Sequence, residues 1–161
     1  MIKNIYVAKS AISGKGVFAK RDFKKGDIIS FFKGKPMTFF VHNKKDALSG
    51  QNWLGVGRNR WIDSEQPLVY INHSCNPNTS VKGKVTLVAL RNIEKNTEIT
   101  MDYAVTEGDL LWEMKEECCC GEKNCRKIIR SIQYLPKKIF NKYMPNVPTY
   151  FKKIYVQSHR K

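Results

Sequence analysis

Short runs of apolar and β-branched residues, separated by Gly, Pro and Asn, fill the first hundred positions of the chain. Such runs predict short strands bounded by turns. We expect strands over residues 5–8, 17–19, 28–32, 38–42, 53–56, 60–63, 84–90 and 98–103. The stretch Lys33-Gly34-Lys35-Pro36 is interpreted as a break between two of them. The pattern therefore predicts a mainly β fold of many short strands.

The last third of the chain has helical spacing instead. In 109–117, apolar residues recur at that spacing and Asp109 is the expected N-cap. Segments 128–135 and 137–143 are also expected to be helical and to stop at Pro136 and Pro145. Six aromatic residues recur among the lysines of this region: Tyr134, Phe140, Tyr143, Tyr150, Phe151 and Tyr155. Disordered segments seldom carry so many aromatics, so we expect a partly helical extension that packs on the domain.

Length and composition then narrow the class of protein. The chain has 161 residues and 42% apolar residues, enough for one domain with a core. No apolar run approaches ~18 residues, so we expect no membrane span. The first ten residues lack the apolar stretch of a secretory signal, which predicts an intracellular, reducing compartment.

Positive charge is concentrated near the C-terminus. The net charge is +15, and the segment 123–161 holds eleven Lys or Arg and no acidic residue. Such an excess is typical of a surface for nucleic acid or another polyanion. A solvated, lysine-rich face that only aids solubility is the alternative.

Five cysteines, four of them within eight residues, suggest a metal site. Without a secretory signal, a disulfide framework is disfavoured because the cytosol keeps thiols reduced. The run Cys118-Cys119-Cys120-Gly121-Glu122-Lys123-Asn124-Cys125 has a C-x-C-x₄-C spacing, and Cys75 is the obvious fourth ligand. Thiolates suit tetrahedral zinc, whereas iron–sulfur proteins use other spacings. His73 could replace a cysteine, and Cys119 is expected to point away.

Two polar segments are candidate site elements. The loop Tyr70-Ile71-Asn72-His73-Ser74-Cys75-Asn76-Pro77-Asn78 is dense in polar side chains, as functional loops are. A turn held by Asn and Ser side chains would look similar. The strand 98–103 ends in Asp102-Tyr103, where a tyrosine taken alone is more often a core residue with one hydrogen bond.

Taken in order, four segments resemble the SET-domain protein lysine methyltransferases that carry a post-SET zinc segment. They are Gly14-Lys15-Gly16-Val17-Phe18, the NHSC-x-PN run 72–78, the strand 98–103, and the cysteine run. The resemblance covers about residues 4–128, and a chain of this size is similar to stand-alone bacterial or viral members. It implies small curled β-sheets in which the NHSC segment and the last strand cross in a pseudoknot. We expect a SET domain over 4–106, a post-SET zinc segment over 114–130, and a basic C-terminal extension over 131–161.

The resemblance also implies residue roles. Lys15 and Gly16, in the glycine turn, would meet the methyl donor S-adenosylmethionine, which Asn72 and His73 would hold. Tyr103 would be catalytic and would also contact this cofactor. The ligands of a structural zinc would be Cys75, Cys118, Cys120 and Cys125.

The chain departs from the family pattern at several positions. Phe32 stands in the cofactor-binding position where a Tyr is usual and so lacks the hydroxyl, and Met101 replaces a common Phe or Tyr. Met is pliable and cannot donate a hydrogen bond, so we expect transfer beyond one methyl group. None of the departures removes Tyr103, the Asn-His pair or the cysteines.

The predicted function is an S-adenosylmethionine-dependent protein-lysine N-methyltransferase, with a histone tail as first substrate. If the substrate is a histone, we expect the protein in the nucleus or on the chromosome, and otherwise in the cytoplasm. A basic histone tail is not attracted by a basic surface, so the charge would serve DNA or the nucleosome beside it, or solubility. The alternative function is a non-enzymatic zinc module that binds chromatin or nucleic acid and retains a degenerate methyltransferase site.

Overall fold

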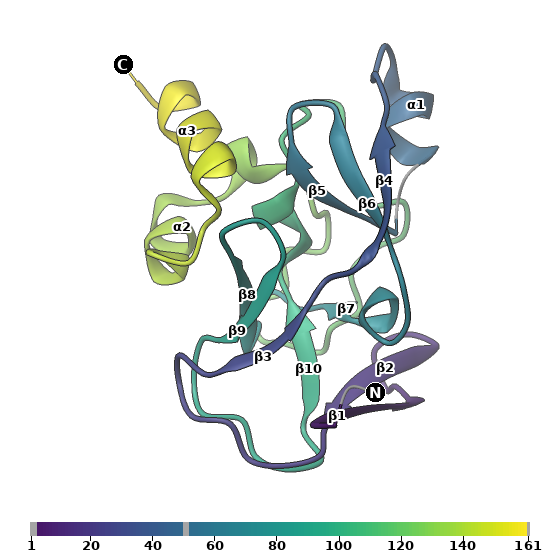
Figure 1. Cartoon of the computed structure of the whole chain (residues 1–161). Coiled ribbons are helices and arrows are strands. Elements are labelled where there is room, and N and C mark those ends of the chain that lie inside the picture. The colour runs from purple at the N-terminus through teal and green to yellow at the C-terminus, as the bar shows by residue number, and fades with distance from the viewer. Residues whose placement is uncertain (1–2, 50–51, 161) are drawn as a thin grey trace.

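Three small β-sheets form the body of the protein in a computed structural model that describes residues 3–49 and 52–160 (Figure 1). The first sheet has the order β1-β2-β10-β7. Its strands are β1 (Ile5–Lys9), β2 (Lys15–Ala19), β10 (Glu98–Met101) and β7 (Asn72–His73). The second has the order β3-β9-β8, with β3 (Ile28–Phe31), β9 (Thr86–Ala89) and β8 (Thr79–Lys82). The third has the order β4-β6-β5, with β4 (Gly34–Thr38), β6 (Arg60–Ser64) and β5 (Trp53–Gly57).

Helices lie at the margins of these sheets. The α-helices are α1 (Lys44–Ser49), α2 (Lys137–Tyr143) and α3 (Thr149–Ser158), and the 3₁₀ turns are η1 (Leu68–Tyr70), η2 (Tyr103–Thr106) and η3 (Ile132–Tyr134). Figure 1 shows α2 and α3 together on one side of the molecule, away from β1 and β2. No helix in the described part of the chain is long and apolar enough to cross a membrane.

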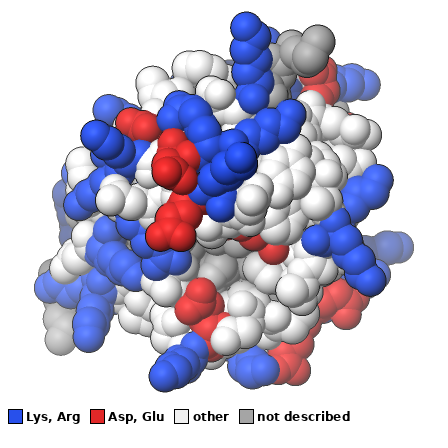
Figure 2. Space-filling model, turned by 90° about the horizontal axis from the view of Figure 1, so that it is seen from below, with Lys and Arg blue, Asp and Glu red and all other residues white. Residues whose placement is uncertain are grey.

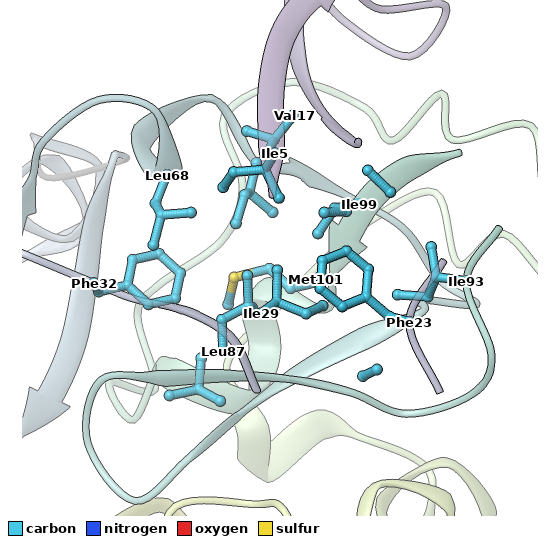
Figure 3. Close-up of a cluster of buried hydrophobic side chains, with 14 of the residues drawn as sticks. Ile5, Val17, Phe23, Ile29, Phe32, Leu68, Leu87, Ile93, Ile99 and Met101 are labelled. Carbon is cyan, nitrogen blue, oxygen red and sulfur yellow. The ribbon is translucent and has the colours of Figure 1, made fainter. Parts of the chain in front are cut away.

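One hydrophobic core lies between the sheets. Val17, Leu87 and Ile99 are fully buried, each supplied by a different strand. Figure 3 shows these side chains converging with others from β1, β3 and the loops. Side chains of a strand alternate between its two faces, so strands of four or five residues can each supply only a few core residues. A core built from such short strands therefore needs many of them.

A second core joins the C-terminal extension to the body. Phe140 of α2 stacks on Tyr155 of α3 with ring centroids 3.7 Å apart. Phe151 reaches β5, where a Cβ at Gly55 would lie 3.1 Å from its ring. Ala104 of η2 is buried in the same cluster. The expectation that the extension packs on the domain is therefore confirmed, and its helices contact the segment directly after β10.

Several expected elements differ from the structure. Residues 34–38 form β4 rather than a break, because β4 is an edge strand paired only with β6 and so tolerates Pro36. The expected strand 38–42 is reduced to its first residue, because the pairing of β4 with β6 ends at Thr38, opposite Arg60. Of 128–135 only η3 is helical, whereas 137–143 is confirmed as α2. The helices α1 and α3 were not predicted.

The helix expected over 109–117 is also absent. Asp109 caps only a local turn, in which its Oδ1 accepts from the Leu111 backbone N–H. Glu113 instead forms a β-bridge with Arg130, and the Met114 backbone N–H donates to the Ile129 carbonyl. Pairing with the segment after the cysteine run therefore replaces the local helical bonds.

Candidate active site and metal centre

The parallel pair β7–β10 builds the centre of the site. It sets Asn72 opposite Thr100 and His73 opposite Met101. The two strands are far apart in sequence, so only the folded chain brings their side chains together. The pairing places the NHSC segment beside the last strand.

Asn72 ties the glycine turn to β10. Its Nδ2 lies 3.0 Å from the Lys15 carbonyl, 3.2 Å from the Ser13 carbonyl and 2.8 Å from Glu98 Oε1. A Cβ at Gly16 would overlap Glu98 Oε1, so the missing side chain allows this carboxylate to approach the turn. Asn72 and Glu98 thus hold the turn in place.

His73 lies in the wall of the site and links the segment that begins at Tyr103 to the cysteines. Its Nδ1 accepts the Tyr103 backbone N–H at 3.2 Å, and its Nε2 lies 3.4 Å from Cys75 Sγ. Burial lowers the pKa of His73 to about 4, although Asp102 opposes this shift. The ring is therefore neutral at neutral pH, and since Nδ1 accepts, Nε2 carries the proton that points to the sulfur.

The Tyr103 hydroxyl is held by the backbone. It donates to the Ile71 carbonyl at 2.7 Å. Burial raises the pKa of Tyr103 to about 12, so the phenol stays protonated at neutral pH. With its proton engaged, the hydroxyl oxygen can accept a hydrogen bond from another group.

Two cavities meet at Tyr103. The wide cavity, of about 410 Å³, is lined by Tyr103, the turn Gly14 and Lys15, Asn72, His73 and the segment 114–119. The narrow cavity, of about 50 Å³, is lined by Tyr103 and by mostly apolar side chains, among them Phe32, Leu54, Met101 and Trp112. Ile71 lines both. Tyr103 and Ile71 therefore form part of the wall of both cavities.

The predicted cofactor residues divide between these places. Lys15, Asn72, His73 and Tyr103 line the wide cavity. Phe32 lies with Tyr103 in the narrow cavity, and Gly16 faces Glu98 beneath the turn. The sequence motif locates both residues near the site but does not show which side of Tyr103 they face.

Four cysteines form the candidate metal centre. The sulfurs of Cys75, Cys118, Cys120 and Cys125 all lie within 4.8 Å of one another. A tetrahedral zinc site with Zn–S bonds of about 2.3 Å needs sulfurs about 3.8 Å apart, which this cluster meets with small adjustments. Burial raises the pKa of the Cys75 and Cys118 thiols, so their thiolates need a compensating cation. The donor set therefore fits a closed, structural zinc.

Neighbouring groups support this cluster. The Arg126 backbone N–H donates to Cys75 Sγ at 3.2 Å, and Asn124 Nδ2 donates to the Cys75 carbonyl at 3.2 Å. His73 contacts the cluster from outside through Cys75. Cys119 points away as expected, with its exposed thiol 3.4 Å from the Ile12 carbonyl.

Asp102 connects the two halves of the site, a role that sequence reasoning missed. Its buried carboxylate accepts two bonds of 2.7 Å from Arg126 Nη2 and one of 2.9 Å from the Tyr143 hydroxyl. Its Oδ1 also accepts the Ala104 backbone N–H and so caps η2. The adjacency of Arg126 to Cys125 and of Asp102 to Tyr103 was the available signal.

Glu107 was also missed. It is buried and lines the narrow cavity. Burial raises its pKa well above the usual range, and a hydrogen bond from the Trp61 side chain only partly opposes this. No periodic pattern marks it, since it follows η2 in an irregular segment.

Comparison with known proteins agrees with this geometry. A family model described as the SET domain matches residues 14–104, more than half of the chain. The chain belongs to the SET-domain family. Its mainly β fold of small sheets with C-terminal helices is confirmed, since the solved structure of KRYPTONITE in complex with mCHG DNA and SAH superposes on 80% of the chain with a TM-score of 0.60. That match is 23% identical and covers 29% of the KRYPTONITE chain, so it bears on the fold alone.

Two further SET relatives are closer in sequence. Histone-lysine N-methyltransferase 2D of Homo sapiens is 31% identical over 140 residues, which is 77% of this chain and 2% of the relative. A Plasmodium falciparum protein assigned as a histone methyltransferase is 26% identical, with a TM-score of 0.51 over 64% of this chain and 95% of that one. The chain spans only a small part of the curated relatives it matches.

Proposed function

We propose that this chain is an S-adenosylmethionine-dependent protein-lysine N-methyltransferase. The observation that carries the proposal is the pair of cavities that share Tyr103 in their lining, a wide one bordered by the glycine turn and Asn72 and a narrow one lined mostly by apolar side chains. Membership of the SET family and relatives named as histone-lysine N-methyltransferases support it. The proposal includes the division into a SET domain over 4–106, a post-SET segment over 114–130 and an extension over 131–161.

The wide cavity would hold the methyl donor. When bound, S-adenosylmethionine supplies an electrophilic methyl group on a sulfonium. Asn72 would act by holding the glycine turn through the Ser13 and Lys15 carbonyls, so that the turn's backbone faces the ligand. The Lys15 ammonium lies 5.1 Å from the centre of the Tyr70 ring, at the edge of this cavity. Gly16 and Phe32 would act from beneath and beside the ligand rather than from the lining of this cavity.

The narrow cavity would take the substrate lysine. The aliphatic stem of this lysine would lie against Leu54, Met101 and Trp112 in the lining of the narrow cavity. Desolvation lowers the pKa of an amine from about 10.4, which favours the neutral nucleophile. The Tyr103 oxygen would accept an N–H from this amine and orient its lone pair. Since the phenol is protonated at neutral pH, Tyr103 would position the amine and would not remove its proton.

Zinc would be structural. Four thiolates leave no open coordination position for substrate. The ligand Cys118 lies within the segment 114–119 that lines one side of the wide cavity, and the ligand Cys120 directly follows this segment. Metal binding would therefore fix a wall of the cofactor site.

A histone tail is the proposed substrate, and the nucleus or chromosome the proposed location, because the similar curated proteins are named for histone-lysine methylation. The test is transfer of labelled methyl groups to histones and to unrelated basic proteins, followed by mapping of the modified lysine. Tyr103→Phe is the matched control, since it keeps the ring and removes the hydroxyl. Histone labelling that is lost in this variant supports the proposal, and labelling that it retains contradicts the role of Tyr103.

The non-enzymatic alternative gives a different result. A zinc module with a degenerate site would show no rise in melting temperature with S-adenosylmethionine and no labelling of any protein. That outcome would refute the methyltransferase proposal as a whole.

DNA is the proposed second partner, through the exposed face of α2 and α3. Residues 137–160 hold six Lys or Arg and no acidic residue. Lys137 and Lys138 on α2, and Lys152 and Lys153 on α3, are exposed. On the face seen from below, Figure 2 shows basic side chains mixed with acidic ones, which suits a polyanion less well. Lys161 belongs to the same charge run but lies outside the described residues.

Duplex DNA binding tests this surface. Replacing Lys152 and Lys153 by Glu should weaken binding and should reduce the slope of log K against log[salt] by about 0.9 for each phosphate that is no longer neutralised. The same double change at Lys24 and Lys25, exposed in the loop after β2, is the control. Equal losses of DNA affinity in the two double variants would refute a binding surface located on α3. DNA binding should persist in Tyr103→Phe.

A further inference from the structure

Two adjacent side chains of helix α2 contact the segments that follow β7 and β10. Lys142 Nζ donates to Asn76 Oδ1 at 2.7 Å, in the loop that follows β7. The Tyr143 hydroxyl donates to Asp102 Oδ2 at 2.9 Å, directly after β10. The matched SET region ends at residue 104, so both contacts come from a part of the chain outside it.

The Tyr143 hydroxyl and its acceptor are buried away from solvent. Tyr143 and Asp102 are each only 1% exposed. The Tyr143 ring is packed in the second core with Phe140 and Phe151. Burial, and then the nearby Asp102 carboxylate, raise the pKa of Tyr143, so its hydroxyl remains a donor at any working pH.

Asp102 in turn determines where Tyr103 lies. It is the residue immediately before Tyr103, and its Oδ1 caps η2 through the Ala104 backbone N–H at 3.1 Å. The carboxylate is therefore clamped on one side by Arg126 from the cysteine segment and on the other by Tyr143 from α2. Loss of either donor lets the carboxylate, and with it the first residue of η2, shift.

We propose that Tyr143 is a positioning residue for methyl transfer, acting through Asp102 on the Tyr103 hydroxyl. The inference rests on the proposed function. It makes the extension part of the catalytic apparatus rather than a separate appendage. A displacement of about 1 Å at a reacting centre can cost on the order of 10²-fold in rate, so a small release of Asp102 is measurable.

The chain offers a matched control for this residue. Tyr155 lies in the same extension, is buried in the same core, and its hydroxyl has no hydrogen-bond partner among the described residues. Tyr143→Phe and Tyr155→Phe therefore make the same chemical change, one with and one without the contact to Asp102. Both are measured in the 161-residue chain, well below the melting temperature of each variant.

Tyr143→Phe should lower kcat about tenfold while changing the KM of either substrate by less than about twofold, because the loss is felt at the reacting groups. Tyr155→Phe should leave both constants within about twofold of wild type. The affinity for S-adenosylhomocysteine should be the same in both variants, which checks that the wide cavity is intact. A kcat for Tyr143→Phe equal to that of Tyr155→Phe overturns the inference.

A double variant tests the route through Asp102. If Tyr143 acts only through that carboxylate, adding Tyr143→Phe to Asp102→Asn should cause no further loss of kcat. Full additivity of the two losses contradicts the route. Should Asp102→Asn fail to fold, the comparison of Tyr143→Phe with Tyr155→Phe still decides. An active wild type with a kcat for Tyr143→Phe equal to that for Tyr155→Phe refutes this inference alone, whereas an inactive wild type refutes the proposed function and the inference with it.

Discussion

Replacing Arg126 by Met removes one partner of a buried ion pair and keeps most of the side-chain volume. Arg126 Nη2 lies 2.7 Å from both Asp102 oxygens, and the Asp102 side chain is 1% exposed. The backbone N–H of residue 126 still donates to Cys75 Sγ in the variant, so the cysteine cluster keeps its support. The change therefore acts on the Asp102 carboxylate.

The size of the effect follows from burial. Removing one partner of a buried pair costs about 3–5 kcal/mol, because the other charge is left without compensation. The Arg126 side chain is 16% exposed, so water reaches part of the pair and we expect the lower end, about 3 kcal/mol. At about 2–4 °C per kcal/mol for a chain of this size, the melting temperature should fall by roughly 10 °C.

Arg130→Met is the control, because it breaks a similar contact at the surface. Arg130 Nε lies 3.1 Å from Glu113 Oε2, with side chains 48% and 27% exposed. Exposed pairs contribute about 0–1 kcal/mol, so this variant should melt within a few degrees of wild type. Thermal melts and urea unfolding of both variants provide the comparison. If Arg126→Met loses no more stability than Arg130→Met, the structural role assigned to the Asp102 pair is wrong.

Three other changes test separate features. The raised pKa of Glu107 means that the folded protein binds this proton more tightly, so the stabilisation is complete below the usual value of 4.5 and is lost as the pH rises toward the folded value. Glu107→Gln should therefore unfold at a higher temperature than wild type at pH well above 4.5. The difference in melting temperature should shrink on acidification, and a difference that does not depend on pH would contradict this reasoning. Cys120→Ser should lose bound zinc in metal analysis and several kcal/mol of stability, on the order expected for a structural site, whereas Cys119→Ser should retain the metal. Met101→Tyr enlarges a side chain in the narrow cavity and should shift the products, measured by mass spectrometry, toward fewer methyl groups. An exclusively monomethylated product from the wild type would refute the expected role of Met101.

The sequence determined the local elements and the motif residues. Strands β1, β2, β3, β5, β6, β9 and β10 follow from apolar runs between turn residues, and α2 from its spacing between two prolines. The cysteine spacing, with Cys75 as the fourth member, predicted the cluster that the structure brings together. These features are encoded within a few neighbouring residues, or in a spacing that one ion can bridge.

Tertiary structure decided the features that depend on distant segments. The segment 109–117 has helical spacing but pairs with the chain after the cysteine run, because backbone groups offered by that neighbour replace its local bonds. The side of Tyr103 on which Phe32 lies depends on how β3 leads into the third sheet, and no periodicity reports that.

The charged extension shows the same division. Its composition, read along the chain, indicated a basic surface and an aromatic-rich packed segment, and both are present. The contact of Tyr143 with Asp102, across 41 positions, could not be predicted, because a buried tyrosine hydroxyl satisfies its hydrogen bond with whichever acceptor the folded chain places beside it. The pairing of β7 with β10 and the packing of α2 beside them decide which acceptor this is. Only the folded chain contains that information.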